Sequence, residues 1–419
     1  ARLLHRDVHP HATGPERADM TLRERIEQEI RQHGPIPFSR YMELCLYEPG
    51  LGYYAQRKEQ FGKAGDFYTS SDVHAVFGRL MARQFEEMWR VLGSPERIEI
   101  IELGPGRGLF ARDVLDWSRQ KFPDFSRALH YTLVEASAAL REKLGVTLNE
   151  YIAAGKAAVV GDAASNVSTP AIIFANEFFD ALPVEVLSNQ GALRIGRDAG
   201  RFVESFVSAS AAEMEYLDRY SVHPEEGERV EVGLEAQRWM SRIAAAVPRG
   251  FVVIIDYGYT REELLAGRHR GTIMCYRQHS ASDNPYEAPG EQDITAHVNF
   301  TALRASGEQA GLECLGLVTQ AQFLMGIGEE TQFSDAFEDA RLPQERAKRA
   351  LQLKHLVTPA GMGETFQVLV MSKGVEREKT AGLGGLRLLA GARQGDSPTR
   401  SATPQSDPGG RRGGRAPYR

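Results

Sequence analysis

Between Arg97 and Glu177 the chain alternates short apolar runs with helical patterns, and this alternation restricts the possible folds more than any other feature. The apolar runs read RIEIIEL, LHYTLVEA, KAAVVGDA and AIIFANE, and the stretches RGLFARDVLDWSRQKF and SAALREKLGVTL separate the first three of them. Strands that are apolar almost throughout are typical of a parallel sheet with helices on both faces. The sequence therefore predicts an α/β fold built on a mostly parallel sheet.

Outside this alternation the pattern changes twice. After Pro183 the residues follow a period of two with turn signals, which is typical of antiparallel hairpins, and GFVVIIDYG and FQVLVMSKG read as two more core strands. We therefore expect five regions: a disordered extension at 1–19, a helical or lid region at 20–92, a core at 93–373 with insertions at about 184–250 and 259–300, and a disordered Gly/Arg/Pro-rich tail at 374–419.

Composition excludes several classes of function. A net charge of -6 gives no bulk reason to bind nucleic acid, and no apolar run is long enough to insert into a membrane. The three cysteines form no CxxC pair, so we expect neither a disulfide framework nor a cysteine-based metal site. These features indicate a protein of a reducing compartment.

A glycine-rich turn connects the first strand of the alternation to the helix that follows. In IELGPGRG the glycines are Gly104, Gly106 and Gly108, and they permit a tight turn and a close approach of the backbone to a ligand. Their GxGxG spacing differs from the GxGxxG of dinucleotide-binding proteins, which disfavours a nicotinamide dehydrogenase. By itself a glycine pattern is weak evidence of function.

Acidic residues near the expected ligand edge make the pattern more specific. Glu102 lies just before the first glycine, and Glu135 ends the second strand, where a carboxylate can accept hydrogen bonds from a ribose diol. Asp162 follows the third strand, where it either reaches an adenine amino group or is a plain turn residue. Together these features form the pattern of an S-adenosylmethionine (SAM) site.

Longer motifs carry a resemblance to a known family. PIPFSRYMELCLYEPGLGYYA, GDFYTS, ELGPGRG, ANEFFDALPVEV, IDYGY and PGEQDITAHVNF resemble the MidA family of class I SAM-dependent methyltransferases, over roughly residues 35–374. The resemblance implies a Rossmann-like methyltransferase fold with antiparallel and helical insertions for substrate recognition, and SAM binding at Gly104, Gly106 and Glu135. It also implies dimethylation of an arginine on a core subunit of respiratory complex I. We expect a bacterial, cytoplasmic member; a eukaryotic one would lie in the mitochondrial matrix.

The segment after the fourth strand carries the candidate catalytic groups. It brings Asn176, Glu177 and Asp180 to the edge of the sheet where a methyl group would be transferred, with Asn176 also able to contact the cofactor. One carboxylate would bind the guanidinium and the other would accept its proton. Phe178 and Phe179 would exclude water or stack on the cation. Alternatively, Asp180 caps a helix and the phenylalanines belong to the core.

The remaining candidates lie in three other segments. GDFYTS provides three further cofactor-binding candidates in a lid or a structural turn: Gly65, Asp66 and Thr69. Four residues apart, Asp293 and His297 would share one face of a helical turn and form an acid–imidazole pair; alternatively they are a structural pair that holds the long loop. A metal site would need a third ligand that this spacing does not supply, so no metal is expected. Substrate contacts are also expected from Tyr54, Asp256, Tyr257, Asp293 and His297.

The sequence thus predicts a SAM-dependent protein methyltransferase that acts on a protein partner, with homodimerisation possible. Three alternatives remain: a methyltransferase for another protein residue, one for a small molecule, and an assembly chaperone that binds SAM without turnover.

Overall fold

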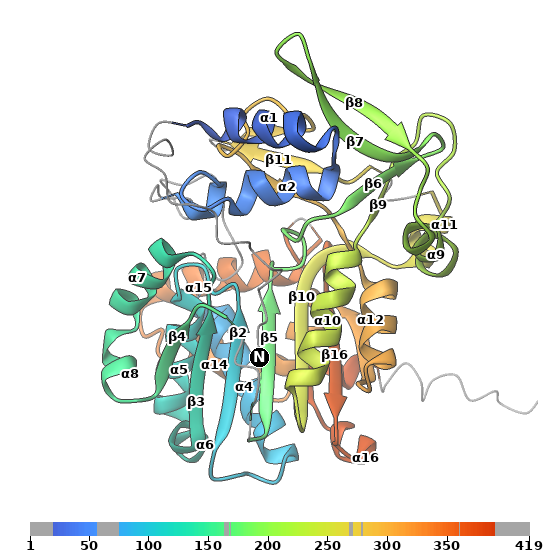
Figure 1. Cartoon of the computed structure of the whole chain (residues 1–419). Coiled ribbons are helices and arrows are strands. Elements are labelled where there is room, and N and C mark those ends of the chain that lie inside the picture. Colours follow the sequence, from blue (N-terminus) through green and yellow to red (C-terminus); the bar gives the residue numbers. More distant parts are fainter. Residues whose placement is uncertain are drawn as a thin grey trace, which may run out of the picture.

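The computed structural model describes residues 20–56, 75–162, 167, 169–267, 271–277, 280–359 and 361–389. These residues form two lobes, a large sheet flanked by helices and a smaller lobe that lies over one end of the sheet (Figure 1). The described part of the chain includes no helix with both the length and the apolar character needed to cross a bilayer.

The large sheet has the strand order β15-β16-β10-β5-β2-β3-β4, and β14 (Val298–Asn299) pairs with the end of β10. All neighbours are parallel except β16, which is antiparallel to β10 and to β15. The strands are β2 (Ile98–Leu103), β3 (Leu129–Val134), β4 (Ala157–Val160), β5 (Ala171–Asn176), β10 (Gly250–Tyr259), β15 (Glu313–Thr319) and β16 (Phe366–Lys373). The chain reverses its direction across the sheet between β2 and β5, which is where such folds bind ligands. The predicted α/β architecture is confirmed.

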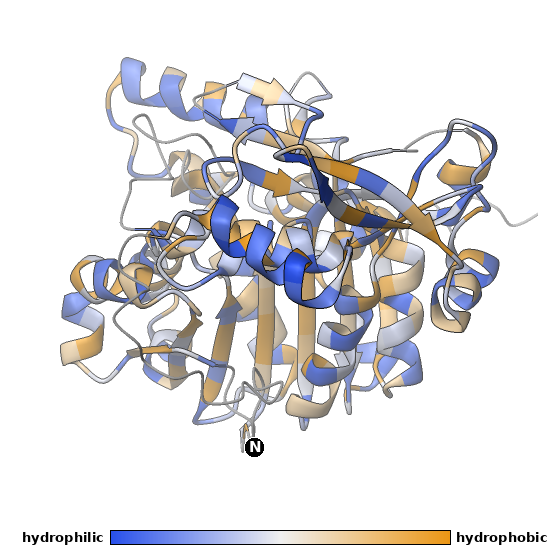
Figure 2. Ribbon diagram, turned by 45° about the horizontal axis from the view of Figure 1, so that its top comes forward, coloured by the Kyte–Doolittle hydropathy of each residue, from blue (hydrophilic) through white to orange (hydrophobic). Residues whose placement is uncertain are grey.

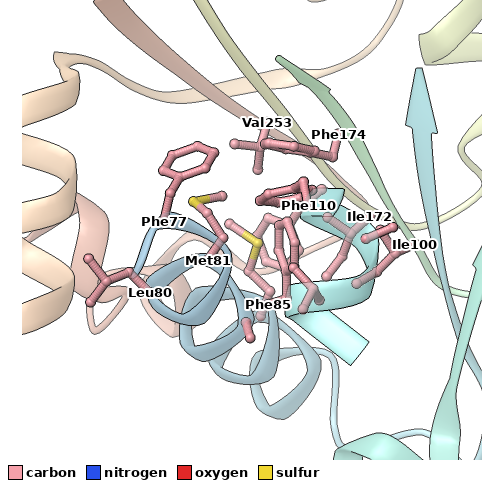
Figure 3. Packing of buried hydrophobic residues seen from close by; sticks show 14 of the residues in the cluster. Phe77, Leu80, Met81, Phe85, Ile100, Phe110, Ile172, Phe174 and Val253 are labelled. Atoms are coloured by element: carbon pink, nitrogen blue, oxygen red, sulfur yellow. The ribbon is translucent and has the colours of Figure 1, made fainter. Parts of the chain in front are cut away.

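Helices cover both faces of this sheet. On one face Phe85, from α4, packs edge-on against Phe174, which stacks on Phe110 with 4.6 Å between ring centroids (Figure 3). On the other face Trp239 and Leu303 pack on Ile173 and Ile254. The helices of the first group are α4 (Ala75–Val91), α5 (Leu109–Lys121), α6 (Pro123–Ala128), α7 (Ala138–Thr147), α8 (Asn149–Ala153), α13 (Gln320–Glu329), α14 (Ser334–Phe337) and α15 (Pro343–Val357), and the second group is α10 (Leu234–Ala246) and α12 (Phe300–Gln309). Figure 2 shows that apolar residues run along the central strands, as burial on both faces requires.

The smaller lobe joins the N-terminal segment to the two insertions. Tyr41 and Met42 pack with Leu193 and Ile294 in one apolar cluster, so segments far apart in the sequence share a core. The elements of this lobe are α1 (Leu22–His33), β1 (Ile36–Pro37), α2 (Phe38–Tyr47), η2 (Tyr53–Ala55), β6 (Glu185–Ser188), β7 (Gly191–Asp198), β8 (Arg201–Val207), α9 (Ala211–Tyr220), β9 (Val230–Val232), α11 (Arg261–Leu265), β11 (Met274–Arg277), β12 (Ser280–Ser282) and β13 (Asp293–Thr295). The expected region 20–92 is therefore divided, because α4 packs in the core of the large sheet.

The C-terminal segment differs from the expected disordered tail up to residue 389. It forms α16 (Arg377–Thr380) and η3 (Gly384–Leu386), and both Leu383 and Leu386 are buried. The amide of Gly384 donates to Glu87 Oε2 at 2.8 Å, and a Cβ at Gly385 would lie only 2.2 Å from the Phe323 ring. The prediction was wrong here because these leucines supply apolar surface and the glycines permit close packing. The rest of the expected tail and the expected extension at 1–19 lie outside the described residues.

Candidate functional site

A cavity of about 2670 Å³ lies where the carboxyl ends of the strands meet the smaller lobe. Its walls come from the glycine turn, the segments after β3 and β5, helix α10, and Tyr54 and Asp293 of the smaller lobe. The cavity therefore occupies the edge of the sheet at which the sequence placed most of its candidate residues.

The glycine turn is left-handed at all three of its predicted glycines, with φ of 64° at Gly104, 53° at Gly106 and 73° at Gly108. Only glycine adopts such angles without strain. Gly104 and Gly106 line the cavity, and a Cβ at Gly104 would press on the Phe178 ring at 3.0 Å. A Cβ at Gly108 would instead lie 2.7 Å from Leu144 of α7. Glycine is therefore needed at position 108 because α5 and α7 pack closely there, and Gly108 lies outside the cavity lining, where a cofactor contact was expected.

Three acidic residues follow or end neighbouring strands beside this turn. Glu102 lines the cavity from β2, and burial raises its pKa to about 8 although Tyr131 donates a 2.9 Å hydrogen bond to it. Glu135 follows β3 and also lines the cavity, and burial raises its pKa to about 7. Its carboxylate is oriented by the amide of Ser137, which donates at 2.7 Å. Asp162 follows β4, and its neighbour Gly161 lines the cavity.

Asp256 holds the segment after β5 in place. Asp256 is fully buried. Its Oδ2 accepts hydrogen bonds from the backbone amides of Phe178, Phe179 and Asp180 at 3.2, 2.9 and 3.3 Å. Its Oδ1 accepts from the amide of Tyr257 at 3.0 Å. Burial and the charges of Asp180 and Glu177 raise the pKa of Asp256, while these amides favour its ionised form. This environment corrects the expected substrate contact: with no exposed surface, Asp256 supports the loop.

The supported loop presents Asn176 and Glu177 to the cavity. Glu177 has a φ of 50°, which is unusual for a residue with a side chain, and its amide donates to Ile255 O at 2.9 Å. Its carboxylate accepts a 3.0 Å hydrogen bond from the Asn176 amide group. Strained backbone of this kind persists only where surrounding contacts impose it, and it concentrates at functional sites.

Asp180 lies deeper than Glu177 and is 3 % exposed. Tyr257 donates its hydroxyl hydrogen to Oδ2, and among the described residues none donates to the buried Oδ1. Burial raises the pKa of this carboxyl to about 6, while the hydrogen bond from Tyr257 and the nearby backbone amides of Ala181 and Asp180 lower it. The alternative that Asp180 caps a helix is wrong, because the described residues after it form turns that lead into β6.

The other candidates separate into cavity and core residues. Phe178 lines the cavity and packs edge-on against Trp239, whereas Phe179 is buried in the core, which contradicts the substrate contact expected of it. Asp293 lines the cavity from a strand, β13, so the helical turn assumed for it and His297 is wrong. His297 packs edge-on against the Tyr257 ring at 5.3 Å, outside the cavity lining. Gly65, Asp66 and Thr69 lie outside the described residues.

Sequence reasoning missed two cavity residues that the fold brings to the loop. Tyr47, at the end of α2, donates its hydroxyl hydrogen to Ala181 O at 2.8 Å and stacks on Tyr54 with 5.6 Å between ring centroids. Trp239 of α10 lines the cavity and packs edge-on against Phe178. Tyr47 lies within the motif LCLYEPG, where an aromatic residue beside a turn could have indicated a ligand contact. Trp239 has no feature in the sequence, beyond its apolar character, that distinguishes it from a core residue.

Comparisons with known proteins agree with this geometry. A family model for S-adenosyl-L-methionine-dependent methyltransferases matches residues 80–318. The Drosophila melanogaster protein named protein arginine methyltransferase NDUFAF7 homolog, mitochondrial, is 31% identical over 85% of each chain. The human NDUFAF7 protein is 28% identical over 82% of this chain and 81% of its own.

Solved structures extend the likeness to three dimensions. A COG1565 superfamily protein from Burkholderia thailandensis, solved with bound S-adenosyl-homocysteine, has a TM-score of 0.76 at 29% identity and covers 87% of this chain and 94% of its own. A second structure from the same organism and superfamily has a TM-score of 0.72 at 30% identity, over 85% of this chain and 92% of its own. This chain is an enzyme that uses SAM, and it belongs to the MidA family of class I SAM-dependent methyltransferases.

Proposed function

We propose that the protein transfers a methyl group from SAM to an arginine side chain of a protein substrate. The observation that carries the proposal is the buried Asp180, which lines the cavity from the segment after β5. Its Oδ1 has no hydrogen-bond donor among the described residues. An arginine guanidinium provides several N–H donors and a positive charge, which match such a group. The names of the relatives, protein arginine methyltransferases, point to the same acceptor.

The residues around the glycine turn fit the cofactor. Gly104 and Gly106 leave no Cβ between the turn and the cavity, and Glu135 offers an oriented carboxylate to a ribose diol. Glu102 and Asn176 line the same part of the cavity, and Asp162 remains a candidate for the adenine amino group. SAM supplies an electrophilic methyl group on a positively charged sulfur.

Replacing Glu135 by glutamine should weaken SAM binding about 10- to 100-fold, because hydrogen bonds from the ribose to an ionised acceptor would be lost. Calorimetry with SAM measures this change. Since burial raises the pKa of Glu135 to about 7, binding to the wild type should also weaken by about tenfold per pH unit below that value. The variant should lack this component, so equal pH dependence in both proteins would refute the ribose assignment.

The acceptor step assigns separate tasks to the two carboxylates. As the N–CH₃ bond forms, the S–CH₃ bond breaks and its electron pair goes to sulfur, while the attacking nitrogen loses a proton. Asp180, with a pKa of about 6, accepts that proton, and the more exposed Glu177 binds and orients the cation. Phe178 restricts water near the reacting atoms.

We propose a core subunit of respiratory complex I as the substrate and support of its assembly as the role. Incubation of that subunit with SAM and wild-type enzyme should produce dimethylarginine, which peptide mass spectrometry detects. Glu177→Gln should lower the rate about 10- to 100-fold through weaker orientation of the cation. Methylation at full rate by this variant would exclude the orienting role, and methyl groups on residues other than arginine would exclude the proposed activity.

An assembly chaperone that uses SAM only structurally is the other candidate, and the same experiment distinguishes it. A chaperone would bind the subunit without transferring label from methyl-labelled SAM. The relatives named NDUFAF7 are mitochondrial proteins. A cytoplasmic location for a bacterial member, and homodimerisation, stay predictions.

A further inference from the structure

Two tyrosine–carboxylate pairs, one from each lobe, lie at the same cavity. On the core side Tyr257 donates its hydroxyl hydrogen to Asp180, and on the side of the smaller lobe Tyr54 donates to Asp293 Oδ1 at 2.8 Å. Both carboxylates line the cavity, and they are 3 % and 2 % exposed, respectively. Buried carboxylates of this kind are stable only when hydrogen bonds or opposite charges compensate them.

Further contacts place the two pairs side by side. The amide of Ala296, just after β13, donates to Asp180 O at 2.9 Å. Tyr47 connects the same two segments, since it donates to Ala181 O at 2.8 Å and stacks on Tyr54. Burial first, and then the charge of Asp293, raise the pKa of Tyr54. The segments that carry Asp180 and Asp293 therefore contact the same pair of stacked tyrosines, Tyr47 and Tyr54.

The hydrogen bonds of this cluster leave one acceptor available. Oδ1 of Asp180 is buried and accepts no hydrogen bond from any described residue. Leaving a charged acceptor without a donor costs more than leaving a neutral one, so a ligand that brings N–H groups would be stabilised at this position. The second carboxylate, Asp293, lines the same cavity from the neighbouring segment, so it can contact the same ligand.

We infer that Asp293 and Tyr54 complete the acceptor pocket beside Asp180, and that the two carboxylates together select a planar guanidinium over an ammonium group. The inference rests on the proposed function. A guanidinium presents N–H donors along several edges of one plane, so two carboxylates can bind it at once. An ammonium group has its three N–H donors on one nitrogen, so it matches two carboxylates less well than the wider guanidinium does. Tyr54 fixes the orientation of the Asp293 carboxylate, and the Tyr47–Tyr54 stack offers an aromatic face.

The test measures binding of small probes to the protein saturated with S-adenosyl-homocysteine. N-acetyl-arginine amide should bind the wild type more tightly than N-acetyl-lysine amide, as followed by calorimetry or NMR titration. Asp293→Asn should weaken the arginine probe by about tenfold or more and reduce the preference over lysine, and Tyr54→Phe should weaken it about threefold to tenfold. Affinity for S-adenosyl-homocysteine should not change.

Two matched variants control for general damage. Glu231→Gln changes a buried carboxylate, 3 % exposed, that accepts a hydrogen bond from the amide of Thr272. Tyr286→Phe removes a tyrosine hydroxyl that donates to Glu204 at 2.8 Å. Neither residue lines the cavity. Both should bind the arginine probe as the wild type does.

Two outcomes would overturn the inference: a wild type that does not prefer the arginine probe, or Asp293→Asn and Tyr54→Phe that behave like the controls. Because binding is measured without turnover, this failure differs from a failure of the proposed function, which would appear as absence of methylarginine in the product of the wild type.

Discussion

Asp180→Asn is expected to lower kcat for methyl transfer about 100-fold or more, since a positioned proton acceptor contributes roughly 10²- to 10⁴-fold to such reactions. Asparagine keeps the shape of the side chain but cannot accept the proton or pair with the cation. SAM binding should be unchanged, because Asp180 belongs to the acceptor side of the cavity. Initial rates with methyl-labelled SAM and calorimetry with SAM measure the two effects separately.

The pH profile gives an independent test of the same residue. Burial raises the pKa of Asp180 to about 6, so kcat/KM of the wild type should rise about tenfold per pH unit up to that value and then level off. The hydrogen bond from Tyr257 lowers this pKa, and Tyr257→Phe should therefore move the inflection to higher pH. Asp180→Asn should lack the inflection, and a variant that retained both rate and inflection would exclude Asp180 as the base.

Linkage shows that better folding cannot explain the expected rise in activity. The folded-state pKa of Asp180 lies above the unfolded value of about 3.9, so the folded protein binds the proton more tightly. Its contribution to the free energy of unfolding is therefore complete below that value and is lost as pH rises through about 6. Activity that increases while this contribution decreases must come from ionisation at the site.

Local patterns in the sequence were sufficient to predict the sheet and its ligand edge. The helix expected at 107–122 is observed as Leu109–Lys121. Such patterns are reliable because burial on one helix face or on two strand faces dictates the spacing of apolar residues. The same logic brought Gly104, Glu135 and Glu177 to one edge, where all three line the cavity.

Contacts between distant segments determine the rest, and local patterns do not contain them. Tyr54 and Asp293 are 239 positions apart, and their hydrogen bond exists because the N-terminal helices and the second insertion share a core. The four-residue spacing of Asp293 and His297 fits a helix, but pairing with β11 draws Asp293 into a strand. From its position at the end of a strand Asp256 is expected to face the ligand, but its carboxylate instead accepts hydrogen bonds from four backbone amides.

Asp256→Asn should lower both stability and activity. Both oxygens of Asp256 accept backbone N–H groups, and asparagine has only one acceptor oxygen, so its amino group would face an amide donor. A buried group without a partner costs about 1–3 kcal/mol, and we expect the free energy of unfolding to fall by about 2 kcal/mol, measured by urea denaturation. Activity should fall further than stability explains, since the loop that carries Glu177 and Asp180 would lose its anchor.

Asp335→Asn separates these two effects. Asp335 is also fully buried, where it accepts from Trp117 Nε1 at 2.9 Å and pairs with Arg83, but it lies outside the cavity lining. Both variants should lose stability, while kcat per folded molecule should fall about tenfold or more only in Asp256→Asn, because misplaced reacting groups lose much of the benefit of orientation. SAM affinity should change little in either. If Asp256→Asn kept a normal kcat despite its lower stability, the left-handed backbone at Glu177 would not depend on Asp256, and the aspartate would serve the fold alone.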